Sequence, residues 1–131
     1  MSMTENLDQS MIEAKLVEII KGAGISENIF SGQRPETVDE KMNDFVVAKV
    51  TGRIYDMQAY GDTVCSIDLY ARNIRGLKNG KRLSAMYKKL NNILPLTDDF
   101  LMLGQATSLA DASDGFGFTV RMINIKTIIK I

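Results

Sequence analysis

The sequence predicts an α+β fold of two layers, in which two amphipathic helices pack on an antiparallel or mixed sheet of about four strands. Apolar residues recur at helical spacing in residues 10–23 and 79–94. Strand-like alternation or short apolar runs occupy residues 45–55, 63–72, 100–106 and 118–131. The apolar faces of sheet and helices cover each other in such a fold, and we expect one domain spanning residues 1–131.

The first helix is indicated by a start signal, an apolar stripe and a stop signal. Residues 1–9 are polar, and we expect them to be disordered. Ser10 and Glu13 match a capping box, in which each side chain binds the backbone N–H of the other residue. Gly22 is the expected left-handed cap after Lys21. The apolar stripe comprises Ile12, Leu16, Ile19, Ile20 and Ala23.

The second helix has the clearest pattern in the chain and is expected to run from about Asn79 to Leu94. Pro95 ends it, because proline lacks a backbone N–H and restricts the residue before it. Lys81 and Lys88 fall on the polar face. The apolar stripe comprises Leu83, Met86, Tyr87, Leu90, Ile93 and Leu94.

The segment between the helices begins with a possible short strand within Ile25–Ser31 and an exposed loop, Gly32–Asn43. Phe45–Tyr55 is the first long strand, and its apolar residues on both faces favour a central position in the sheet. Gly52 lies inside this strand, where a glycine often marks a bulge.

A bend at Asp56–Gly61 leads into a second strand, Thr63–Arg72, which we expect to pair with the first as an antiparallel hairpin. Alternation divides its side chains between two faces. One face carries Cys65, Ile67, Leu69 and Ala71, and the other carries Ser66, Asp68, Tyr70 and Arg72.

The C-terminal part combines a short apolar strand, Phe100–Ala106, a turn-rich and mobile loop, Ser108–Gly117, and a long strand, Phe118–Ile131. The alternation of the last strand changes phase near Met122-Ile123. A bulge at that point, or a strand that changes neighbours there, would explain the change. The alternative is that residues 127–131 form a contact arm that pairs with another chain, because an apolar strand edge is normally covered.

The composition limits the chemistry that the chain can perform. It has 16 basic and 16 acidic residues, one cysteine and no histidine, so the commonest general base and zinc ligand are absent. Near pairs of carboxylates lie in loops, and no glycine-rich phosphate-binding motif or nucleophile motif occurs. The sequence therefore predicts a non-enzymatic protein without a metal or cofactor site. No apolar run is long enough to cross a membrane.

The charges are unevenly distributed although they sum to zero. Residues 1–68 contain twelve acidic and six basic residues, whereas residues 69–97 contain seven basic residues and no acidic one. Such a cluster is most often a solvated helix face. It also fits a docking surface for an acidic partner. Nucleic-acid binding is disfavoured, because domains that bind nucleic acid usually have a basic total charge.

The order of elements, and a few local segments, resemble a known family. The segments are GQRPETVDEKMN, DFVVAKV, SIDLYARN, and a helix ending in LNNILP, followed by an alternating closing strand. Over residues 11–131, this pattern is similar to the small tail-terminator and tail-completion (neck) proteins of long-tailed bacteriophages and prophages. Related contractile machines use similar ring proteins. The chain departs from the simplest members of the family in its elaborate loop at 111–117 and its long last strand.

The resemblance implies a structural assembly protein, either a ring-forming tail terminator or a head–tail joining protein. The expected partners are further copies of the chain, in a hexameric ring, and phage tail-tube and neck proteins. The expected location is the virion, and the host cytoplasm during assembly. The candidate interface residues are Arg72, Arg75, Lys81, Arg82, Lys88, Lys89, Tyr55, Asp56, Tyr60 and Asp62.

Two other functions fit the sequence. One is a small monomeric or dimeric α+β module that binds a ligand or a protein. The other is a small enzyme that uses carboxylates or lysines in place of histidine.

Overall fold

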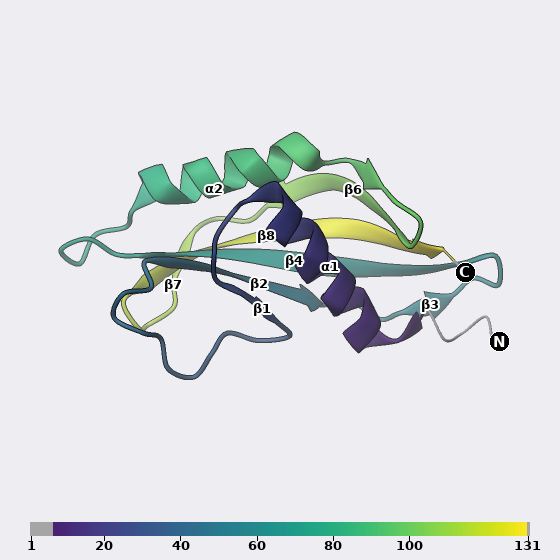
Figure 1. The fold of residues 1–131 in the computed structure, drawn as a ribbon, viewed down its shortest axis with the longest axis horizontal. Helices are drawn as coiled ribbons and strands as arrows, with labels where there is room; N and C mark the ends of the chain where they lie inside the picture. Colours follow the sequence, from purple (N-terminus) through teal and green to yellow (C-terminus); the bar gives the residue numbers. More distant parts are fainter. Residues whose placement is uncertain (1–6, 131) are drawn as a thin grey trace.

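Both helices lie on one face of a single sheet in the computed structural model, which describes residues 7–130 (Figure 1). They are α1 (Gln9–Ala23) and α2 (Gly80–Ile93), close to the predicted ranges. The apolar side chains of both pack on the same sheet face. The α+β prediction with two helices on a sheet is confirmed.

The sheet has eight strands in the described residues, so the prediction of about four was wrong. Its order is β1-β2-β4-β8-β6-β5, with β3 beside β4 and β7 beside β8. β1 runs parallel to β2, and the other pairs are antiparallel. The missed strands β3, β5 and β7 have two residues each, too short for a periodic pattern. The strands are β1 (Ile29–Ser31), β2 (Asp44–Val50), β3 (Tyr55–Asp56), β4 (Tyr60–Arg72), β5 (Leu96–Thr97), β6 (Leu101–Ser108), β7 (Ala112–Ser113) and β8 (Phe118–Lys130).

The last strand contains no bulge against its neighbour, which corrects the prediction at Met122-Ile123. β8 pairs with β4 in an unbroken register from Phe118 opposite Arg72 to Lys130 opposite Tyr60. The apolar pattern changes phase because β8 contributes to two apolar clusters on opposite faces of the sheet. Residues 127–130 belong to this central strand. The register shift instead lies in β6, between Leu103 and Ala106.

The larger cluster lies between the helices and the sheet. Its fully buried members include Ile12 and Leu16 of α1, Leu83 and Leu90 of α2, and Ile67 of β4. Burial of this kind contributes roughly 25 cal/mol for each Å² of apolar surface removed from water. Ile123, Ile125 and Ile129 complete it from β8.

The smaller cluster lies on the other face and is aromatic. The ring of Phe45 stacks on Tyr70 at 4.3 Å between centroids and meets the edge of Phe118 at 5.2 Å. Val38 and Met42 pack against this cluster from the loop that precedes β2. The 32–43 loop, which the sequence predicts as exposed, therefore covers part of the second sheet face.

The helix caps differ from the predicted ones. Asp8, two residues before the expected cap Ser10, accepts a hydrogen bond from the backbone N–H of Met11 at 3.1 Å and caps α1. Glu13 is therefore free for another task, and its carboxylate accepts a hydrogen bond from the backbone N–H of Val50 at 2.9 Å. Gly24, at φ 67°, takes the left-handed position that was predicted for Gly22.

The 109–117 loop is held by ion pairs, although the sequence predicts it as mobile. Arg121 of β8 donates two hydrogen bonds to the Asp111 carboxylate, at 2.7 and 2.9 Å. Lys78, from the β4–α2 loop, donates a third at 3.1 Å. The hydrogen bonds from Arg121 hold the pKa of Asp111 below its ordinary value of 3.8, against the opposing effect of desolvation.

Replacing Asp111 with asparagine is expected to lower the free energy of unfolding at neutral pH by about 1.5–3 kcal/mol, because hydrogen bonds to a charged group are lost. A lowered carboxyl pKa contributes stability above its unfolded value of 3.8, which is lost as the pH falls through the folded pKa. The variant should thus lose less stability than the wild type on acidification below about pH 4. Urea titrations at several pH values measure both effects, and parallel pH curves for the two proteins would contradict the assignment.

Candidate functional site

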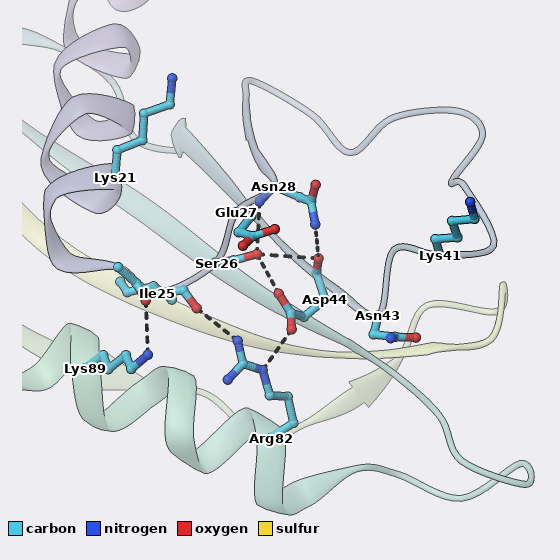
Figure 2. A pocket seen from close by; sticks show the side chains of 11 residues that line it. Lys21, Ile25, Ser26, Glu27, Asn28, Lys41, Asn43, Asp44, Arg82 and Lys89 are labelled. Atoms are coloured by element: carbon cyan, nitrogen blue, oxygen red, sulfur yellow. Dashed lines mark hydrogen bonds and ion pairs between the residues drawn. The ribbon is translucent and has the colours of Figure 1, made fainter.

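An open groove of about 780 Å³ lies between the end of α1, the start of β2 and α2 (Figure 2). Three segments that are distant in sequence form it. They are the end of α1 with the turn that follows, the end of the 32–43 loop with the start of β2, and one side of α2. Its basic lining residues are Lys21, Lys41, Arg82 and Lys89, and its acidic ones are Glu27 and Asp44.

A hydrogen-bond network around Asp44 holds the groove together. The guanidinium of Arg82 donates to the Asp44 carboxylate at 2.8 Å and to the carbonyl oxygen of Ile25 at 3.2 Å. The Ser26 hydroxyl donates to the other carboxylate oxygen at 2.5 Å, and the Asn28 amide donates to the Asp44 carbonyl oxygen at 3.1 Å. Arg82 of α2 therefore joins the turn after α1 to the start of β2, and the groove is built before any partner binds.

Lysines surround this network. Lys89 donates to the carbonyl oxygen of Gly24 at 3.1 Å, where the end of α1 leaves carbonyl groups without helical partners. Lys21 and Lys41 are exposed and stand on separate segments around the groove (Figure 2). No ion pair within residues 7–130 involves either ammonium group. Their positive charge is available to a partner.

A second cavity of about 310 Å³ continues the groove towards the β4–α2 loop. The two cavities share Asn43, Asp44 and Arg82, and the second one adds Arg72 and Ile74. Arg72 donates to the carbonyl oxygens of Asp39 at 3.0 Å and Met42 at 2.9 Å, so its main role is to hold the 32–43 loop.

The β4–α2 loop forms a protruding tip beside this second cavity. Ile74 and Leu77 pair with each other by backbone hydrogen bonds, and Arg75 and Gly76 between them have positive φ values of 53° and 75°. Ile74 is 59% exposed and Leu77 is 72% exposed. The tip thus presents two apolar side chains and one arginine to solvent.

The β3–β4 hairpin lies at the opposite end of the molecule from the tip (Figure 1). Its turn is closed by the backbone N–H of Met57, which donates to Tyr60, and by that of Gln58, which donates to the Asp56 carboxylate at 2.8 Å. Tyr55, Met57 and Tyr60 are exposed by 52%, 47% and 38%. Asp56 is exposed and Asp62 is partly exposed. The hairpin itself therefore carries two carboxylates and exposed apolar surface, and the guanidinium of Arg53, which precedes it, lies 6.0 Å from the centroid of the Tyr55 ring.

The structure divides the predicted interface residues into three groups. Arg72, Arg82 and Lys89 are bonded within the chain around the groove. Arg75 lies at the tip, and Lys81 and Lys88 are exposed on α2. The remaining four, Tyr55, Asp56, Tyr60 and Asp62, lie together in or beside the opposite hairpin. Their role in an interface stays a prediction.

Sequence reasoning missed Lys21, Lys41 and Asp44 as groove residues. Each stands in a different segment, and none belongs to a motif. A signal did exist for Asp44, because this acidic residue directly precedes the apolar run Phe45–Ala48. Its partner Arg82 lies 38 positions away, so the pair could not be identified without the fold.

The buried thiol lies outside this site. Cys65 is buried in the main core, and burial raises its pKa to about 11, so the thiol stays protonated at neutral pH. None of the helices described is long and apolar enough to cross a membrane.

No protein-family model matches this chain, and no curated protein matches it. Among solved structures, the fold resembles a chain in the virion of a native gene transfer agent particle. The TM-score is 0.49 and the sequence identity is 5%, and the match covers 95% of this chain and 94% of that chain.

Proposed function

We propose that this chain is a non-enzymatic assembly protein of a phage or prophage tail, acting as a ring-forming tail terminator or head–tail joining protein. The resemblance of its sequence pattern to that family supports the proposal. The main structural support is the placement of two unlike surfaces. The β4–α2 tip and the β3–β4 hairpin lie at opposite ends of the molecule (Figure 1). The tip is apolar and adjoins the basic groove, whereas the hairpin carries exposed tyrosines and two carboxylates.

Two different and complementary surfaces are what a ring subunit requires. In a ring, each subunit contacts the next through two unlike surfaces, and the assembly closes when the rotation between neighbours fits a whole number of copies. Opposite charge on the two surfaces favours the correct encounter and fixes its orientation. A hexameric ring is the arrangement that the resemblance implies, with tail-tube and neck proteins above and below it in the virion.

Self-association is the direct test. Light scattering and negative-stain images of the purified protein should show a ring, or an oligomer whose mass rises with concentration. A protein that stays monomeric from micromolar to near-millimolar concentrations would contradict the proposal.

Replacing both Lys81 and Lys88 with glutamate is expected to leave the fold intact and to weaken self-association by roughly tenfold. Both side chains are exposed on α2, and no ion pair within residues 7–130 uses them. Sedimentation velocity measures the dissociation constant, and circular dichroism checks the fold. Lys126→Glu, an exposed change on the other face of the sheet, is the control. An unchanged dissociation constant would remove α2 from the contact.

The volume of the groove favours a second candidate function, a ligand-binding module, because small-molecule sites commonly measure about 300–1,000 Å³. Its lysines would then select an anionic ligand. Thermal denaturation with phosphate or a dicarboxylate distinguishes this function. A saturable rise in the melting temperature that is absent from Lys21→Gln/Lys41→Gln would support it.

A further inference from the structure

We infer that the basic groove is the docking site for the β3–β4 hairpin of a second copy of this chain. The inference rests on the proposed self-assembly and names the two surfaces that meet. In this contact the β3–β4 hairpin of one copy enters the groove of the next copy, so all copies have the same head-to-tail orientation.

The groove favours an occupant that carries negative charge, because four basic side chains line it and only two acidic ones, Glu27 and Asp44. Lys21 and Lys41 have no ion pair within residues 7–130, whereas Asp44 is already neutralised by Arg82. The side chains of Asp44 and Arg82 are 18% and 33% exposed, so the base of the groove is largely occupied by its own network. A partner therefore meets the lysines at the rim and the backbone between them.

The hairpin has the matching properties. Asp56 on β3 and Asp62 on β4 supply two carboxylates, and Tyr55, Met57 and Tyr60 supply exposed apolar surface. The Asp56 carboxylate shapes the turn by accepting the Gln58 N–H, so its charge is held in place before docking. Aromatic residues with a polar end are enriched in protein interfaces.

The apolar part of the hairpin also finds a partner surface. Ile74 lines the cavity that continues the groove, and Leu77 lies beside it on the tip. Both side chains are mostly exposed in the isolated chain, at 59% and 72%. A hairpin seated in the groove would cover them with its tyrosine and methionine side chains.

The hairpin cannot reach the groove of its own molecule. β4 spans Tyr60–Arg72, and the hairpin precedes its first residue whereas the tip follows its last (Figure 1). A contact between the two must therefore join different copies. Each docked pair still has one free groove and one free hairpin, so the same contact adds further copies until a ring closes or a chain extends.

Two variants that each remove one surface test the inference. The groove variant is Lys21→Glu with Lys41→Glu. The hairpin variant is Asp56→Asn with Met57→Ser and Asp62→Asn. Asparagine retains an oxygen that can accept the Gln58 N–H, so the turn is preserved while the charge is lost. Lys126→Glu serves as the control, and circular dichroism confirms that each variant is folded.

Each variant alone should associate at least about tenfold more weakly than the wild type, since charged and apolar contacts are lost at the centre of the interface. A mixture of the two should form a 1:1 dimer in sedimentation velocity that grows no further. In this mixture the groove variant supplies an intact hairpin and the hairpin variant supplies an intact groove. The two can form one contact, and the surfaces that remain free are both mutated, so no further copy can add.

The outcomes separate this contact from self-assembly in general. If the wild type forms oligomers and both variants form them equally well, the hairpin–groove contact is overturned while the ring proposal stands. If the variants stay monomeric when mixed, the two surfaces do not meet and the contact is again overturned. A wild type that remains monomeric overturns both proposals.

Discussion

Replacing Arg34 with alanine is expected to lower the free energy of unfolding by about 3–5 kcal/mol, since it leaves a buried carboxylate without its cation. Arg34 stands in the 32–43 loop, and its guanidinium lies 3.0 Å from the Asp114 carboxylate, whose side chain is only 5% exposed. The same guanidinium packs against the rings of Phe45, Tyr70 and Phe116, at 5.2 to 5.8 Å from their centroids. It joins two loops over the smaller aromatic cluster.

Urea denaturation measures this loss, and two further variants identify its cause. Arg34→Lys keeps the charge and loses the planar stacking, so we expect an intermediate effect. Arg34→Met combined with Asp114→Asn removes both charges and should recover most of the stability, because the asparagine oxygen can still accept the backbone N–H groups of Phe116 and Phe118. A loss below about 1 kcal/mol for Arg34→Ala would mean that the two loops are held by other contacts.

Arg34→Ala should also weaken self-association, because the loop that it anchors carries Lys41 of the groove. The effect on association should exceed that of a surface variant of equal stability. This comparison links the loop clamp to the proposed docking site.

Replacing Lys49 with methionine is expected to lower the free energy of unfolding by about 3 kcal/mol or more, because it too leaves a buried carboxylate without its cation. Asp68 of β4 is fully buried, and the ammonium of Lys49 on β2 lies 3.0 Å from its carboxylate. The Ser66 hydroxyl donates to the other carboxylate oxygen. Loss of the ammonium leaves a buried negative charge that a single hydroxyl cannot balance.

A double-mutant cycle tests this assignment. Asp68→Leu in the Lys49→Met background should restore stability to near the wild-type value, because an apolar pair next to Val47 replaces the ion pair. If Lys49→Met alone were within about 0.5 kcal/mol of the wild type, the ion pair would carry no stability.

Asp68 also shows where the sequence pattern reached its limit. Alternation along Thr63–Arg72 correctly assigned Cys65, Ile67, Leu69 and Ala71 to the main core. It could not show that the opposite face is covered as well. Ser66, Asp68 and Tyr70 are buried because strand neighbours and loops from other parts of the chain cover that face.

The change of phase in β8 has the same origin. A change of phase within one strand has two local explanations, a bulge or a change of the buried face, and alternation alone does not separate them. The unbroken pairing of β8 with β4 shows that the buried face changes, because a bulge in β8 would shift that register. The bulge predicted at Gly52 is a different case, because Thr51 and Gly52 both donate to the carbonyl oxygen of Val64 at 3.0 and 3.1 Å. β2 has already ended at Val50, so this irregularity lies after the strand and not inside it.

The charge pattern of residues 69–97 led to several side chains that the fold uses internally. Three of the basic residues selected from residues 69–97, namely Arg72, Arg82 and Lys89, hold loops and helix ends within the chain. Lys21 and Lys41, whose ammonium groups have neither an ion pair nor a hydrogen bond within residues 7–130, come from the acidic half of the sequence. A count of charges along a chain does not report which of them are paired in space.

The sequence by itself determined the α+β class, both helices, the longer strands and most of the main core, because burial of one face imposes a period on neighbouring residues. The tertiary structure alone decided the eight-stranded order, the second apolar cluster, and the groove and the hairpin as two separate surfaces. These features depend on contacts between segments that are far apart in the chain, and such contacts leave no local period in the sequence.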